Sequence, residues 1–203
     1  MPDHALVPAV PSVIEALREA TRSRHVALEA IPAMARIFAP DYTLAEYRQH
    51  LARLLGFYQP LENAVAQVAD SNDPARSITR SNDILEDLRT MGSTPDDIEH
   101  IERCRQLPQI TREGLRGCTY VILGSMLGGR VIVKRLRETL GPGGSFHFYG
   151  DDHNYFQALW KSYRVELEEH GHADVDAICA TAAGIFDAYA AWFLEPARVT
   201  EAL

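Results

Sequence analysis

Apolar residues recur every three or four positions along most of the chain, which is the period of an amphipathic helix. The longest such stripe extends over residues 44–68, and an earlier one over residues 14–28 has His25 on its apolar face. Alternation of apolar and polar residues, the pattern of a half-buried strand, is almost absent. The pattern therefore predicts an all-α fold of bundled helices.

Capping signals indicate where the helices begin. Ser12 with Glu15, and Thr43 with Glu46, have the spacing of a capping box. The remaining stripes predict further helices over residues 84–92, 94–108, 111–140, 151–167 and 174–195.

The chain has 203 residues, a length typical of one domain. We expect a flexible N-terminal segment over residues 1–11 and a single domain over residues 12–203. The first segment has three prolines and no lysine or arginine, unlike a signal sequence. No uninterrupted apolar run approaches the roughly 20 residues that span a membrane, so the sequence predicts a cytoplasmic protein without membrane contact.

Charge and cysteine content exclude further classes. The 20 Lys and Arg residues against 28 Asp and Glu residues give a net charge of −8, which disfavours a general nucleic-acid binder. The three cysteines, Cys104, Cys118 and Cys179, are odd in number and far apart, so neither a disulfide framework nor a zinc knuckle is expected.

Glycines are concentrated in the predicted helix over residues 111–140. Gly124, Gly128 and Gly129 fall within six positions, although each interior glycine costs about 1 kcal/mol relative to alanine. Gly124 and Gly128 are four apart and share a face, with Gly117 near the same face. The bare backbone suits either close packing of a second helix or close approach of a flat ligand.

His25 is the second unusual feature. A histidine on an apolar helix face is most often a hydrogen-bonded core residue, but Arg18 and Arg22 precede it on an adjoining edge and Arg24 is adjacent. An imidazole edged by guanidinium groups suits an iron macrocycle with acidic substituents, because imidazole binds iron and arginine pairs with carboxylates. A solvated basic edge is the alternative.

Three segments, in this order, resemble segments of the heme oxygenase family, and in particular of the bacterial members that supply bilin chromophore to bacteriophytochromes. Residues 17–25 (LREATRSRH) resemble the proximal-histidine helix, and residues 120–131 (YVILGSMLGGRV) resemble the glycine-kinked distal helix. Residues 145–149 with 156–163 resemble the aromatic loop and the helix behind the heme. The similarity extends from about residue 12 to residue 195.

The resemblance implies that heme is both cofactor and substrate and is cleaved with O2 and reducing equivalents to biliverdin, carbon monoxide and ferrous iron. His25 would be the proximal iron ligand. Gly124, Ser125 and Gly128 would form the catalytic distal side. The residues that would bind heme are Arg18, Arg22, Tyr120, Gly129, Lys161 and Arg164.

The sequence departs from the family pattern at three positions. Ser125 stands where much of the family has an aspartate, Gln157 where a further basic residue is expected, and Thr119 where a tyrosine is expected, with Tyr120 one position later. Because propionate anchoring decides which edge of heme is oxidised, the biliverdin isomer is not predicted. A heme carrier or sensor without catalysis is the alternative function.

The resemblance also implies partners. Electrons would come from an NAD(P)H reductase, a ferredoxin or a flavodoxin, and a bacteriophytochrome would receive the product in the bacterial subgroup. The edge formed by Arg18, Arg22 and Arg24 would receive an acidic redox protein.

Other histidines suggest different chemistry. Residues 168–172 (EEHGH) could bind a metal or form a solvated helix end. His50, four residues after Glu46, is expected on a surface edge, and the second Glu-x-x-His motif of a di-iron site is absent. A phosphotransfer bundle needs an exposed histidine followed by Lys-Gly, which His25 is not.

Overall fold

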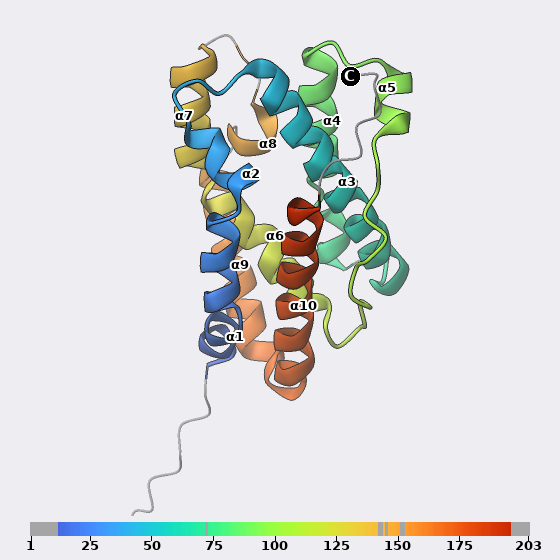
Figure 1. Ribbon diagram of the computed structural model, residues 1–203. Coiled ribbons are helices and arrows are strands. Elements are labelled where there is room, and N and C mark those ends of the chain that lie inside the picture. The colour runs from blue at the N-terminus through green and yellow to red at the C-terminus, as the bar shows by residue number, and fades with distance from the viewer. Residues whose placement is uncertain (1–11, 72, 142–143, 145, 151–152, 196–203) are drawn as a thin grey trace, which may run out of the picture.

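Every element of the described part of the chain is a helix, so the predicted all-α fold is confirmed (Figure 1). The computed structural model describes residues 12–71, 73–141, 144, 146–150 and 153–195. The predicted N-terminal segment, residues 1–11, lies outside the described residues.

The elements follow one another with short connections. In chain order they are α1 (Val13–Glu29), α2 (Pro32–Ala35), η1 (Arg36–Phe38), α3 (Leu44–Val68), η2 (Pro74–Ser77), α4 (Ser81–Thr90), α5 (Pro95–His100), α6 (Leu115–Leu127), α7 (Gly129–Leu140), α8 (His147–Gly150), α9 (His153–His170), η3 (His172–Asp174) and α10 (Val175–Leu194).

Helix α10 is the central element of the packing. It contacts α1 on one side and α6 on another, while α9 packs against both α1 and α6. The short helix α8 lies between α4 and α7, and α7 also contacts η1. Figure 1 shows α2, α7 and α8 together at one end of the bundle, away from the start of α1.

Burial explains the composition of α10. Residues His172–Leu194 are long and apolar enough to cross a membrane, with a mean hydropathy of 1.5. In the fold, Ile178, Ala182 and Ile185 have no exposed surface, because they pack into the core shared with α1 and α6. These apolar residues belong to the core, and 39% of the most apolar window is buried inside the fold.

Only one of the two predicted capping boxes is complete. The Thr43 side chain and the Glu46 carboxylate bond reciprocally at the start of α3. At the start of α1, the Ser12 side chain accepts from the Glu15 N–H, but Glu15 returns no bond. Glu168 caps this end instead, because its carboxylate accepts from the backbone N–H groups of Val13 (3.1 Å) and Ile14 (3.0 Å).

This contact gives the EEHGH segment a structural role. Burial alone would raise the pKa of Glu168, but the hydrogen bonds from Ser12 and the backbone of α1 outweigh burial and lower it. No cluster of three metal-ligating side chains occurs among the residues that the structure describes. The metal alternative for residues 168–172 therefore has no structural support.

Two predicted helices differ from the observed ones. Helix α5 ends at His100 rather than near Pro108, because the following chain crosses α3 and the Cys104 N–H donates to the Gly56 carbonyl at 2.8 Å. A Cβ at Gly56 would lie 2.4 Å from the Glu102 carbonyl oxygen, so only glycine allows this crossing. The long helix predicted over residues 111–140 is divided into α6 and α7 at Gly128.

Candidate functional site

A cavity of about 870 Å³ lies between α1 and α6, with further walls from α3, α7, α8 and α10. Its lining is mainly apolar. Three apolar side chains at its rim are strongly exposed: Val26 (62%), Phe38 (46%) and Val131 (66%). Exposed apolar surface gathered around a concave site indicates a ligand that covers it.

The glycines of α6 serve two different purposes. A Cβ at Gly117 would lie 2.1 Å from the Ile178 carbonyl oxygen, and one at Gly114 would lie 2.0 Å from Thr181 Oγ1. These two glycines therefore permit close packing of α6 on α10. A Cβ at Gly124 or Gly128 would meet nothing within 4 Å, and both residues line the cavity. The packing interpretation therefore holds for Gly114 and Gly117, whereas the backbone at Gly124 and Gly128 is open to the cavity.

His25 lies on α1 with its ring at the cavity wall, 6.0 Å from the ring of Phe186. The imidazole is 63% exposed, unlike a core histidine. Its Nδ1 lies 3.5 Å from Oε1 of Glu29, one turn later on the same helix. A carboxylate beside Nδ1 orients the ring and leaves Nε2 for a metal. Glu29 is not among the residues expected at the site, although its spacing of four residues from His25 is visible in the sequence.

The three arginines of α1 make different contacts. Arg18 and Arg22 line the cavity, and Arg22 approaches Glu19 at 3.3 Å. Arg24 instead donates to Asp187 of α10 at 2.8 Å. The basic edge beside the cavity is therefore formed by Arg18 and Arg22, whereas Arg24 joins α1 to α10.

Helix α9 contributes an aromatic wall. Tyr120 lines the cavity with its ring 5.6 Å from that of Trp160. Thr119, at the position where the family pattern has a tyrosine, is buried and donates to the Leu115 carbonyl. The aromatic ring at the cavity is that of Tyr120, one position later. Lys161 and Arg164 are exposed on α9 and are not part of the lining.

Gly129 has a different position from the one expected. It is buried and does not line the cavity, and a Cβ there would lie 2.4 Å from the Tyr149 carbonyl oxygen. The glycine thus lets the backbone of α8 approach the first turn of α7. Its expected contact with a ligand is corrected to a packing role.

Ser125 is part of a hydroxyl chain that reaches the cavity. The Tyr58 hydroxyl of α3 donates to Ser125 Oγ at 3.1 Å, and Ser125 donates to the Ile122 carbonyl at 2.7 Å. Burial raises the pKa of Tyr58, so the phenol keeps its proton at neutral pH. The long stripe of α3 included Tyr58 but gave no sign of its partner on α6.

His50 was expected on a surface edge, and this expectation is wrong. The residue is only 7% exposed, lines the cavity, and has its Nε2 2.7 Å from the Tyr149 hydroxyl. Burial lowers the pKa of His50 to about 4 and raises the pKa of Tyr149. Both groups are therefore uncharged at neutral pH. The spacing from Glu46 could not reveal that α8 covers this face of α3.

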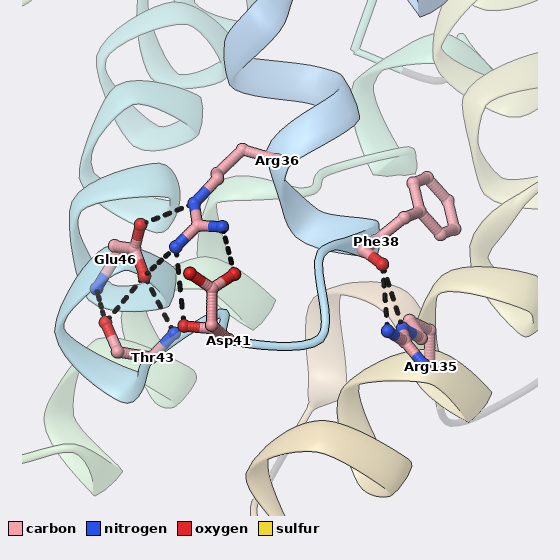
Figure 2. A network of polar contacts seen from close by, with 6 residues as sticks. All are labelled: Arg36, Phe38, Asp41, Thr43, Glu46 and Arg135. Atoms are coloured by element: carbon pink, nitrogen blue, oxygen red, sulfur yellow. Dashed lines mark hydrogen bonds and ion pairs between the residues drawn. The ribbon is translucent and has the colours of Figure 1, made fainter.

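The edge of the cavity at η1 is fixed by a polar network, which Figure 2 shows. Arg36 donates to Glu46 at 2.8 Å and also bonds Asp41, so η1 is held to the start of α3. From the other side, Arg135 of α7 donates through Nε and an Nη to the Phe38 carbonyl, at 3.2 and 2.9 Å. These bonds keep the rim residue Phe38 in place.

The residues fit a heme group. The exposed imidazole of His25 borders a mainly apolar cavity. Gly124 and Gly128 leave open space in another wall that a Cβ at either position would begin to fill, and the guanidinium groups of Arg18 and Arg22 also line the cavity. Imidazole is a usual axial ligand of heme iron. The fold and the site together thus define an α-helical protein with a cavity suited to a planar iron macrocycle.

The comparisons identify the family. The chain belongs to the heme oxygenase family, whose model matches residues 12–195. No curated protein sequence matches the chain. Membership supports an enzyme of heme degradation, as the three resembling segments implied. The narrower bacteriophytochrome-associated group is not distinguished by this match.

Solved structures share the fold. Heme oxygenase from Leptospira interrogans superposes with a TM-score of 0.71 at 21% identity, over 90% of this chain and 98% of that one. Heme oxygenase-1 from the cyanobacterium Synechocystis, solved in complex with heme, gives a TM-score of 0.66 at 19% identity, over 90% and 91% of the two chains.

Substitution of the glycines by alanine should separate their two roles. We expect Gly117→Ala to lower the free energy of unfolding by about 1–3 kcal/mol, because its Cβ collides with a backbone carbonyl. Gly124→Ala should leave the ligand-free protein equally stable or stabilise it by up to about 1 kcal/mol, since its Cβ meets open space. Urea unfolding followed by circular dichroism measures both. Equal destabilisation by the two changes would contradict the assignment.

Stability should depend on the protonation of His50. A histidine in the unfolded chain titrates near pH 6.5, whereas the pKa of His50 in the fold is about 4. The free energy of unfolding is therefore independent of His50 above about pH 6.5. It decreases as the pH falls toward 4, by up to about 1.4 kcal/mol per pH unit, because the unfolded chain then binds a proton that the folded protein does not.

Urea unfolding at neutral pH and near pH 5 measures this slope. His50→Gln has no titrating proton and can still accept from Tyr149, so it should flatten the slope. The matched control is His100→Gln, because His100 is exposed on α5 and its backbone bond to Asp96 raises its pKa. A slope unchanged in His50→Gln would refute the assignment.

Proposed function

We propose that the protein is a heme oxygenase that converts heme, O2 and reducing equivalents to biliverdin, carbon monoxide and ferrous iron, with His25 as the axial iron ligand. One observation carries this proposal: the side-chain-free face at Gly124 and Gly128 borders the same cavity as an exposed imidazole on another helix.

His25 and Glu29 act together in this proposal. The Glu29 carboxylate lies beside Nδ1, so Nε2 would be the nitrogen that holds the iron. Heme, when bound, supplies both the iron that activates dioxygen and the carbon bridge that is cut. The bare backbone at Gly124 and Gly128 would leave space beside the bound heme for a small molecule such as O2.

Tyr58 and Ser125 can deliver a proton. The Ser125 hydroxyl donates to the Ile122 carbonyl, and Tyr58 donates to Ser125 Oγ. Rotation of the Ser125 hydroxyl into the cavity would let it donate there while Tyr58 continues to support its oxygen. We infer that this chain, with ordered water, fulfils the function of the aspartate found elsewhere in the family.

The basic residues at the cavity edge would orient the bound heme. Arg18 and Arg22 offer guanidinium groups to the propionates at the cavity edge. Lys161 and Arg164 remain proposed contacts outside the lining. The same edge would receive an acidic electron donor of the reductase, ferredoxin or flavodoxin type. We propose a cytoplasmic enzyme, with a bacteriophytochrome as the recipient of biliverdin.

The direct test is turnover. Purified protein should bind one equivalent of hemin, and addition of a reductant and air should replace the Soret band with the spectrum of biliverdin. Chromatography of the extracted pigment identifies the tetrapyrrole and its isomer. A stable oxygen complex that only autoxidises, without pigment cleavage, would show a carrier instead of an enzyme.

His25→Ala should remove the axial ligand. We expect a shifted Soret band and turnover reduced by at least about 100-fold, with partial recovery of the spectrum on addition of imidazole. His100→Ala is the matched control because His100 lies on α5, outside the cavity. An unchanged Soret band in His25→Ala would exclude this histidine as the ligand.

A further inference from the structure

The His50–Tyr149 pair is fixed to the cavity wall from two directions. Tyr149 follows two backbone N–H groups, those of His147 and Phe148, that donate to the fully buried Asp87 carboxylate at 2.9 and 3.0 Å. Gly129 allows the backbone of α7 to press against the Tyr149 carbonyl. The pair therefore stands on a backbone that has little freedom to move.

Neighbouring rings hold the pair as well. The imidazole of His50 stacks on the Tyr149 ring at 6.1 Å and lies 5.9 Å from the ring of Phe193. These contacts belong to a closed circuit of rings, which we name the aromatic floor. Its members are His50, Phe193, Tyr189, Phe57, Tyr58, Phe148 and Tyr149.

The pair lies apart from both Ser125 and the arginines. His50 precedes Tyr58 by eight residues on α3, which is about 12 Å along the helix. Arg18 is in the first half of α1. The other end of α1 is followed by α2 and η1, and η1 contacts α7, which in turn contacts α8. Figure 1 shows α8 at this far end of the bundle. A ligand that extends from Arg18 toward α8 thus meets guanidinium at one edge and the pair at the other.

The pair is neutral but not hydrogen-bond saturated. If Tyr149 donates to Nε2, an acceptor lone pair remains on the phenol and an N–H remains on Nδ1; if the bond is reversed, the phenol O–H is left to donate. Either arrangement can hold a water molecule. The nearest cation, the buried Arg80 guanidinium, is already bonded to Asp83 and to the Phe148 carbonyl and does not line the cavity. A carboxylate at this end would therefore be desolvated without a cation of the lining to pair with, which is costly.

We propose that the His50–Tyr149 pair is a specificity determinant that selects the in-plane orientation of the bound tetrapyrrole, an inference that rests on the proposed function. An apolar wall distinguishes weakly between the methyl and vinyl groups of the rim, whereas a wall with polar groups disfavours any orientation that strips them of their water. The preferred orientation is the one that directs the carboxylates to Arg18 and Arg22 and leaves space for water at the pair.

The experiment measures orientation without turnover. Each orientation of hemin in the ferric cyanide complex gives its own set of shifted heme-methyl proton resonances. We expect one dominant set in the wild-type protein. In Tyr149→Phe and in His50→Leu, the ratio of the dominant to the minor set should fall by about fivefold or more, the effect of one lost hydrogen bond. His50→Gln, which still accepts from Tyr149, should retain the wild-type ratio.

The matched control is Tyr163→Phe. Tyr163 is a buried phenol on α9 that donates to the Arg116 carbonyl and does not line the cavity. Its loss should change stability but not the resonance ratio. The biliverdin isomers formed by each variant should follow the resonance ratios.

Two further results have distinct meanings. Wild-type ratios in both Tyr149→Phe and His50→Leu, or two equal sets in the wild-type protein, overturn the specificity role and leave the proposed function intact. Failure of the wild-type protein to bind hemin overturns the proposed function itself and this inference with it.

Discussion

The close contact of α6 with α10 determines where the cavity lies. At Gly114 and Gly117 the backbone of α6 rests against Thr181 and the Ile178 carbonyl, an approach that any side chain at these positions would prevent. Helix α1 packs on the same α10. The two helices are thus positioned by a common partner, and the cavity with His25 and Gly124 opens between them. A single change at Gly117 would displace both walls relative to each other.

The rest of the wall is assembled around α3. This helix brings two polar side chains, His50 and Tyr58, to a lining that is otherwise mainly apolar, and each is bonded to a residue distant in sequence. A buried polar group without a partner would cost about 1–3 kcal/mol. The pairing keeps that cost small while it leaves hydrogen-bonding capacity at the cavity. The aromatic floor fixes the positions of both pairs.

The sequence predicted the helical fold and the two helices of the site, because both depend on periodicity and on residue types that are visible locally. It could not separate Gly117 from Gly124, since both lie on nearly one face and only the position of α10 distinguishes them. The role of Gly129 depends on the nearby backbone of Tyr149, and the burial of His50 depends on its contact with Tyr149 of α8. Neither contact is visible in the sequence. The early end of α5 has the same origin, a contact of Cys104 with Gly56.

The distribution of charge connects the fold with its proposed chemistry. The charged residues that line the cavity, Arg18, Arg22 and Glu29, are exposed, whereas the polar groups of the buried wall are neutral. At position 125, which is exposed, an ionised aspartate could accept from the Tyr58 phenol but could not donate. A serine hydroxyl can both accept and donate. In the proposed function, the neutral wall would favour proton delivery by rotation of hydroxyl groups and by water over delivery from an acid, and it would leave the attraction of anionic groups to the arginines at the edge.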